Sequence, residues 1–343
     1  MHFASDNWSG AHPKIMAALT RANDGYAPSY GGDALTKRVE LRFAEIFERE
    51  VAVFFVATGG AANSLALSQL SPPWGMILCH EESHIQMDEC GAPEFFSNGA
   101  KLLVVQTPDG KLSPEGIRAI ASSRSDIHFP KPRVVTITQP SETGQVYKVD
   151  EVQAISAICR ELGLRLHMDG ARFAHACATL DCAPADITWR AGVDVLCFGG
   201  TKNGMAVGDA IIFFDRALAE DFGYRCKQAG QLASKMRFLA APWVGMLESG
   251  AWLRNAQHGN ACAQRLASKI KDVPGVATMF PVEANTVFVS APAPVLDALR
   301  ERGWRFYTFI GEGGCRLMCA WDTRPEDVSA FAGDLRELMA DLR

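Results

Sequence analysis

Short apolar runs alternate with segments of helical periodicity over the first two thirds of the chain. The helical segments, clearest at 35–47 and 149–162, carry apolar residues every three or four positions, and a helix of small residues is expected at about 61–70. The apolar runs, in contrast, have the length of strands. This alternation is typical of an α/β fold in which a mostly parallel sheet is flanked by helices. The predicted strands span residues 51–56, 76–79, 102–106, 134–138, 164–168, 193–198 and 210–214.

The pattern changes after Pro242, where a long helical region extends to about Lys271. Short strands and a closing helix follow it, which predicts a smaller C-terminal α/β domain. We expect residues 1–245 to form the large domain and residues 246–343 to form the small one. The elements predicted after the long helical region are strands at 286–289 and 315–319 and a helix that begins at Pro325.

The composition is that of a globular protein, with 48% hydrophobic residues and a net charge of only −5. This balance argues against a polyanion-binding surface, so we expect no nucleic-acid partner. The ten cysteines are scattered among apolar residues, and the first ten residues contain no basic-then-apolar signal segment. We therefore expect a reduced, cytoplasmic location. We expect no membrane association, because no apolar stretch approaches the roughly 18 residues of a membrane span.

Two polar residues each end a predicted buried strand. Asp169 follows the run at 164–168, and Lys202 lies in a glycine-flanked turn after the run at 193–198, 33 positions further on. Such a pair suits pyridoxal phosphate, because a carboxylate favours protonation of the ring nitrogen and a lysine binds the aldehyde. Taken singly, Asp169 is equally well a helix N-cap and Lys202 a surface lysine. Together and in this order they favour the cofactor site.

The turn Thr58-Gly59-Gly60 lies between a predicted strand and a predicted helix. Amides and a hydroxyl at the positive end of a helix can receive a phosphate group. Alone, such a turn is more often just a tight connection, and it gains weight only beside Lys202 and Asp169. Nucleotide sites fit less well, because no GxGxxG follows a strand and a threonine, not the glycine of a P-loop, precedes Lys202.

Residues His80, Glu81 and His84 match the HExxH pattern of zinc peptidases, whose histidines lie on one face of a helix. The pattern here directly follows a predicted strand, and no third-ligand motif comes after it, so we expect no metal. In the cofactor interpretation His84 lies flat against the pyridine ring. The plainer alternative is a loop histidine at the end of a strand.

An arginine on a predicted apolar strand of the small domain, Arg316, needs an anionic partner. A substrate carboxylate would suit it, with Arg172 and Ser5 as additional donors. An internal salt bridge is the alternative, and the sequence pattern alone does not decide between them.

Several of these segments resemble the motifs of the L-threonine aldolase family, and the likeness spans nearly the whole chain. It is strongest to the bacterial branch known as low-specificity threonine aldolases or phenylserine aldolases, especially through residues 88–101. The segments that carry the resemblance are 83–85, 88–101, 167–172, 201–204 and 235–237, with residues 5–7 and Arg316 at its two ends.

The resemblance implies the fold of aspartate aminotransferase, with pyridoxal phosphate bound to Lys202. It places Asp169 at the ring nitrogen and His84 against the ring. It also implies dimers or dimers of dimers with active sites at subunit interfaces, so that Tyr30, Lys235 or Arg237 would serve a neighbour's site. The remaining residues that it implies are Thr58, Gly59, Gly60 and Thr201 for the cofactor, and Ser5, Tyr30, Arg172 and Arg316 for the substrate, with Arg172 also near the cofactor.

One departure from the family is visible at the phosphate turn. Many members have Ser-Gly-Thr where this chain has Thr58-Gly59-Gly60, so one hydroxyl donor is missing. His128 matches a family histidine near the substrate, although as a loop residue it could equally be structural.

The leading hypothesis is retro-aldol cleavage of L-threonine, L-allo-threonine and related β-hydroxy-α-amino acids, including phenylserine, to glycine and an aldehyde. A base must take the β-hydroxyl proton, and His84 or a water that it orders is the first candidate, with His128 the second. Transamination or β-elimination would use the same lysine and aspartate. The alternatives from other classes are a zinc peptidase and a catalytically silent binding protein.

Overall fold

The computed structural model describes residues 2–308 and 314–342. Its centre is a seven-stranded sheet in the order β1-β7-β6-β5-β4-β2-β3. The five strands from β6 to β3 run parallel, and β7 is antiparallel to both of its neighbours. The strands are β1 (Ala52–Val56), β2 (Gly75–His80), β3 (Lys101–Val105), β4 (Lys131–Thr138), β5 (Arg165–Gly170), β6 (Val195–Gly199) and β7 (Asp209–Phe213).

The mostly parallel sheet that the apolar runs predicted is confirmed, with strand ends that differ by at most three residues. Every residue of β2, β6 and β7 is buried. A strand that is covered on both faces has apolar residues at successive positions. This is why the sequence shows continuous apolar runs and not an alternation of apolar and polar residues.

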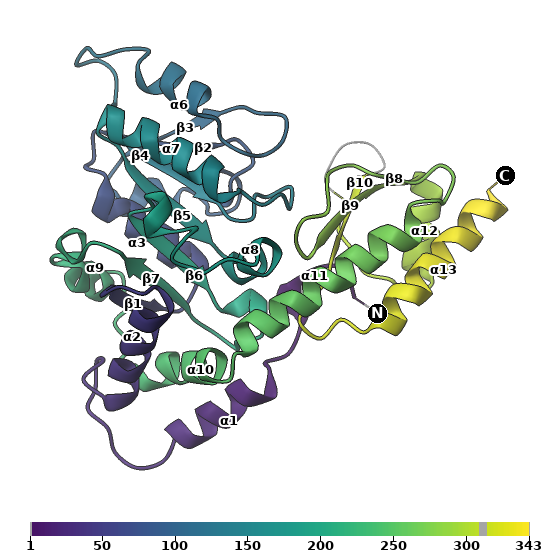
Figure 1. Cartoon of the computed structure of the whole chain (residues 1–343), viewed down its shortest axis with the longest axis horizontal. Helices are drawn as coiled ribbons and strands as arrows, with labels where there is room; N and C mark the ends of the chain where they lie inside the picture. The colour runs from purple at the N-terminus through teal and green to yellow at the C-terminus, as the bar shows by residue number, and fades with distance from the viewer. Residues whose placement is uncertain (1, 309–313, 343) are drawn as a thin grey trace.

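Helices cover both faces of this sheet (Figure 1). One face packs against α2, α7, α8 and α10, and the other packs against α3 and α9. The helix α3 begins at Gly59, two residues before the predicted start. The helices of this part are α1 (Pro13–Ala22), α2 (Ala34–Ile46), α3 (Gly59–Leu70), α4 (His84–Met87), α5 (Ala92–Phe96), α6 (Pro114–Ala121), α7 (Val149–Leu162), α8 (Phe173–Leu180), α9 (Phe222–Gln228) and α10 (Arg237–Glu248).

The long helical region predicted after Pro242 is two helices. Pro242 lies inside α10, which begins at Arg237, and α11 (Ala251–Ile270) follows it. The break falls at Gly250, whose left-handed φ of 67° a helix cannot accommodate.

A second, smaller group of helices and strands lies beside the C-terminal part of α11 (Figure 1). Its three-stranded antiparallel sheet has the order β10-β9-β8. Its core contains Cys262 and Leu266 of α11 and, from the N-terminal end of the chain, Phe3. Ala256 of the same helix packs instead in the core beside the seven-stranded sheet. The elements are β8 (Ala277–Thr278), β9 (Thr286–Ser290), α12 (Ala293–Glu301), β10 (Gly314–Met318) and α13 (Pro325–Asp341).

Among the described residues, no helix combines the length and the apolar character that a membrane crossing requires.

Candidate active site

A cavity of about 370 Å³ opens where the parallel strands end. Its walls include Thr138 at the end of β4, Asp169 near the end of β5 and Cys197 on β6, and the first turn of α3 closes one side. Ligands of α/β proteins bind at this edge of the sheet, in pockets of roughly 300–1,000 Å³. The cavity therefore has the place and the size of a small-molecule site.

Lys202 reaches this cavity from a short turn after β6. The turn is a 3-10 helix (Thr201–Asn203) that ends at Gly204, whose φ of 99° favours glycine. The side chain of Asn203 donates to the carbonyl of Trp252 at 2.7 Å, and Asn255 donates to the carbonyl of Asn203 at 2.9 Å. These bonds to α11 hold the turn in place, so that both Thr201 and Lys202 line the cavity.

Asp169 lies in the wall of the same cavity and is buried. Its Oδ2 accepts a hydrogen bond from Asn63 Nδ2 at 2.9 Å, and its Oδ1 accepts one from the amide of Ala171 at 2.9 Å. Asn63 is on α3, so one buried amide joins the helix to the end of β5. The structure thus brings Lys202 and Asp169 together, as the sequence predicts.

The first turn of α3 presents backbone amides to the cavity, because its first two residues, Gly59 and Gly60, have no side chains. Thr58 caps the helix by accepting from the amide of Ala61 at 3.2 Å, and the amides of Gly59 and Gly60 belong to the first turn, whose N–H groups have no partner within the helix. A Cβ on Gly59 would lie 2.9 Å from Asp209 Oδ2, which leaves no room for a larger residue. Backbone donors at the positive end of a helix fit a phosphate group, and Asp169 and Lys202 fit the ring and the aldehyde.

His84 is held by a carboxylate that the sequence analysis did not assign. Its Nδ1 lies 3.0 Å from Glu89 Oε1, and the same oxygen accepts from Asn63 Nδ2 at 2.9 Å. The bond to Glu89 and the charge of Asp169 raise the pKa of His84, although burial opposes the shift. A chain of polar contacts therefore joins His84 to Asp169 through Glu89 and Asn63.

Arg172 makes a two-pronged ion pair with Asp6. Its Nε and Nη2 donate to the two carboxylate oxygens of Asp6 at 2.6 and 3.0 Å, and Asn285 Nδ2 lies 3.2 Å from Asp6 Oδ2. Burial alone would raise the pKa of Asp6, but Arg172 holds it at about 2. Arg172 lines the cavity, and the half-buried Ser5 is the neighbour of Asp6 in the chain.

Arg316 lines an adjoining cavity of about 810 Å³. Its guanidinium lies 5.7 Å from the ring centre of Tyr307, and its Nη2 lies 3.4 Å from the carbonyl of Ala4. Burial and the nearby charge of Arg172 lower its pKa. Glu142 lines both the 370 Å³ cavity, called the inner cavity below, and the 810 Å³ cavity, called the outer cavity, and among the described residues it is the one that the two linings share.

Among the candidate residues, Ser5 lines neither cavity, and His128 and Tyr30 lie away from the site in this chain. His128 is exposed and precedes the first residue of β4, so it lies at the edge of the sheet opposite to the cavity. Tyr30 is 51% exposed, has a left-handed φ of 56°, and holds Lys227 at 4.9 Å from its ring centre. Within one chain, neither side chain lines the site.

The HExxH pattern does not form the helical site of a zinc peptidase. His80 is the last residue of β2, whereas His84 begins α4. Nδ1 of His80 accepts from the amide of Glu82 at 3.1 Å, and its Nε2 lies 3.1 Å from the carbonyl oxygen of Thr107. Both ring nitrogens are therefore engaged, and no group of three or more metal-binding side chains occurs within residues 2–308 and 314–342.

Sequence reasoning missed four polar side chains of the site: Asn63, Glu89, Glu142 and Asp209. Asn63 lies among small residues of α3, and Glu89 lies inside the segment that carried the resemblance. Buried Asp209 accepts from the amide of Gly200 at 2.9 Å at the start of β7. A charged residue at the start of an otherwise apolar strand was the available signal for Asp209.

Comparison with known proteins agrees with this geometry. Residues 2–293 match the family model described as beta-eliminating lyase. The chain is 62% identical over 338 residues to a low specificity L-threonine aldolase of a Pseudomonas species, covering 98% of each chain. It is also 62% identical over 337 residues to the enzyme of the same name from Pseudomonas aeruginosa, covering 98% of this chain and 97% of that one.

A solved structure of a threonine aldolase has the same fold as this chain. The threonine aldolase of Leishmania major superposes with a TM-score of 0.93 at 29% identity, covering 98% of this chain and 99% of that one. A match of this quality over the full length confirms the expected fold. The chain belongs to the L-threonine aldolase family.

Proposed function

We propose that this chain is a pyridoxal phosphate-dependent aldehyde-lyase that cleaves L-threonine, L-allo-threonine and related β-hydroxy-α-amino acids such as phenylserine to glycine and an aldehyde. The observation that carries the proposal is the convergence of Lys202, Asp169 and the first turn of α3 on one cavity. The 62% identity to two low specificity L-threonine aldolases supports the reaction type.

Each part of the cavity has a defined task toward the cofactor. The bound cofactor supplies an electron-accepting ring that stabilises negative charge at the substrate's α-carbon. Asp169 keeps the ring nitrogen protonated, and Asn63 and the amide of Ala171 fix the direction of its carboxylate. Lys202 binds the aldehyde group. Thr201 and the turn at Thr58, Gly59 and Gly60 hold the phosphate, and His84 lies against the ring.

The substrate carboxylate is held by arginines at the border of the two cavities. Asp6 occupies Nε and Nη2 of Arg172, which leaves Nη1 for the substrate carboxylate, with Arg316 and Ser5 as further donors. Fixing the carboxylate orients the Cα–Cβ bond. Orientation of reacting groups can contribute about 7–11 kcal/mol when it is ideal.

We further propose a cytoplasmic homodimer or homotetramer in which residues 1–245 and 246–343 form the two domains. Exposed apolar side chains support assembly: Ile127, next to His128, is 96% exposed, and Tyr30 is half exposed in a strained backbone conformation. In an oligomer, His128 and Tyr30 would complete a neighbour's site, together with Lys235 or Arg237.

Product analysis tests the reaction. The purified chain with pyridoxal phosphate and L-threonine is expected to release glycine and acetaldehyde in equal amounts. Transamination would instead require an amino-group acceptor and release a 2-oxo acid, and β-elimination would release ammonia. Either of these product patterns in place of glycine and acetaldehyde would refute the proposed reaction.

A further inference from the structure

We propose that Glu142 is the catalytic base that accepts the β-hydroxyl proton of the substrate. The inference rests on the proposed aldolase function and adds a residue that neither the sequence motifs nor the comparisons assign. It replaces His84 and His128 in this one role, and it leaves His84 against the cofactor ring.

The position of Glu142 carries the argument. Its half-buried side chain lines the inner cavity together with Lys202, Asp169 and His84, and it lines the outer cavity together with Arg316. The amino group of the substrate would take the place of Lys202 at the cofactor aldehyde, and its carboxylate would bind the arginines, so its side chain is left to face the remaining wall. Glu142 lies where the inner cavity meets the outer one, and the proposal places the β-hydroxyl group of the substrate beside it.

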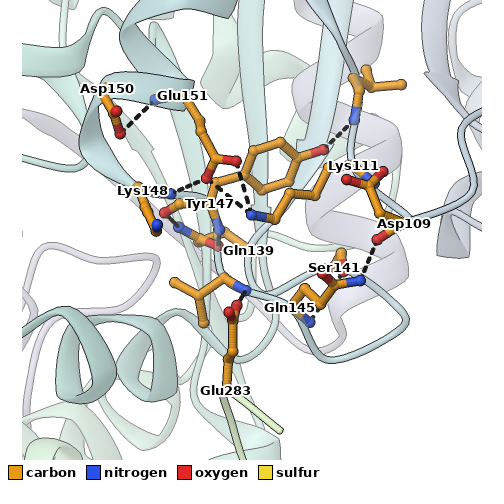
Figure 2. A network of polar contacts seen from close by, with 12 residues as sticks. Asp109, Lys111, Gln139, Ser141, Gln145, Tyr147, Lys148, Asp150, Glu151 and Glu283 are labelled. Carbon is orange, nitrogen blue, oxygen red and sulfur yellow. Dashed lines mark hydrogen bonds and ion pairs between the residues drawn. The ribbon is translucent and has the colours of Figure 1, made fainter. Parts of the chain in front are cut away.

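A network of polar contacts braces the loop between Gln139 and Tyr147, which carries Glu142 (Figure 2). The side-chain amide of Gln139 accepts from the amide of Tyr147 at 2.9 Å and donates to its carbonyl at 2.8 Å, which closes the loop at its base. Within the loop, the amide of Ser141 donates to the carbonyl of Gln145 at 2.8 Å. Gln145 Nε2 also binds outside the loop, where it donates to the carbonyl of Asp109 at 2.6 Å.

Further contacts tie the loop to both domains (Figure 2). The hydroxyl of Tyr147 accepts from the amide of Leu112 at 2.6 Å, and the amide of Val146 donates to Glu283 at 2.7 Å. Lys111 pairs with Glu151 at 2.9 Å just beyond the loop. These contacts hold the backbone on both sides of Glu142 in place, and a proton-transfer residue requires such a fixed support.

Electrostatics agree with the assignment. Burial raises the pKa of Glu142, Asp169 adds to this shift, and the positive charges of Lys202, Arg172 and His84 oppose it. A carboxylate with a raised pKa is a stronger base than an ordinary one. His84 is the poorer candidate on geometry, because Glu89 engages its Nδ1 and its ring is placed against the cofactor in the proposed site.

The proposed step balances. The hydroxyl proton moves to an oxygen of Glu142, and the electron pair of the O–H bond becomes the second C–O bond of the aldehyde. The electron pair of the breaking Cα–Cβ bond stays with the α-carbon. Glycine forms when that carbon takes up one proton, so no oxidant or reductant is needed.

The test compares Glu142→Gln with Glu82→Gln in the holoenzyme. Glu82 lines only the outer cavity and is exposed, so it is a matched control. Two rates are measured for each: cleavage of L-threonine, and exchange of the α-hydrogen of glycine in D₂O. Glycine has no hydroxyl group, so its exchange needs the cofactor, Lys202 and the arginines but not a β-hydroxyl base.

We expect Glu142→Gln to lower kcat for cleavage by about 10²–10⁴-fold, while glycine exchange and the cofactor's visible band stay close to the wild type. The wild-type kcat should fall as pH falls through the raised pKa of Glu142, because the protonated carboxyl group cannot accept a proton. This decrease of kcat at low pH should be absent in Glu142→Gln. Glu82→Gln should match the wild type in both rates.

Two outcomes would overturn the proposal: unchanged cleavage in Glu142→Gln, or equal loss of cleavage and exchange, which would make Glu142 a residue that positions the cofactor or substrate. The aldolase function itself fails in a different way. In that case the wild type exchanges the hydrogen of glycine but releases no glycine from threonine.

Discussion

Replacing Asp6 by asparagine tests how the N-terminal segment supports the site. Asp6 is fully buried and binds both Nε and Nη2 of Arg172. In Asp6→Asn the amide nitrogen would face one of these donors, so one hydrogen bond and the ion pair are lost. Asp6 is not among the residues that line the cavity, whereas Arg172 is, so we expect any change in substrate binding to pass through Arg172.

The size of the effect follows from the pKa of Asp6, which falls from 3.8 to about 2 in the folded chain. At 1.36 kcal/mol per pKa unit, this fall corresponds to about 2 kcal/mol of stability. Because the folded-state pKa is the lower one, the contribution is complete above pH 3.8 and disappears as pH falls toward 2. The variant should therefore be less stable at pH 7 and approach the wild type in acid.

The assay is urea unfolding followed by tryptophan fluorescence at equal protein concentration, with the exposed Asp24→Asn as the control. We expect Asp6→Asn to lower the free energy of unfolding by about 2 kcal/mol at pH 7, and Asp24→Asn to change it by less than about 0.5 kcal/mol. We also expect a raised KM for threonine with the cofactor still bound. Wild-type stability and KM in Asp6→Asn would refute the reasoning.

Three further predictions concern the cofactor cradle, the ring histidine and metal. Gly59→Ala should weaken cofactor binding by about 1–3 kcal/mol, because its Cβ would lie 2.9 Å from Asp209 Oδ2. The Cβ of Gly60→Ala would meet nothing closer than 3.7 Å, so this variant should bind the cofactor normally. Equal dissociation constants of the two variants in a fluorescence titration would contradict this prediction. Glu89→Gln should lower the pKa of His84, which NMR of labelled histidine can follow, and an unchanged titration would show that Glu89 does not hold the proton there. Dialysis against a chelator should leave threonine cleavage unchanged, because both ring nitrogens of the first histidine in the HExxH pattern are engaged; loss of turnover that zinc restores would reverse that conclusion.

The sequence predicted the sheet and the meeting of Lys202 with Asp169 for one physical reason. Strands buried on both faces are continuous apolar runs, and a charged residue at the end of such a run is conspicuous. Parallel strands bring their carboxyl ends to one edge of the sheet, so residues 33 positions apart in the chain line one cavity. The start of α3 was less clear, because two glycines that favour a turn also begin the helix.

The polar contacts between distant segments could not be predicted in the same way. Asn63 and Asp169 are 106 positions apart, and Asp6 and Arg172 are 166 apart. Neither pair leaves a periodic signal, because its partners meet only when the sheet, α3 and the N-terminal segment have packed. The location of His128 also depended on the fold, since only strand direction shows that it lies at the opposite edge from the cavity.

The most direct test of the account is to find where the cofactor binds. Borohydride reduction of the chain loaded with pyridoxal phosphate makes the link between cofactor and lysine permanent, and peptide mass spectrometry then identifies the modified residue. We predict one modified position, Lys202, with loss of the visible absorption band in Lys202→Ala. Modification of another lysine, or a chain that stays colourless and unmodified with added cofactor, would contradict the account.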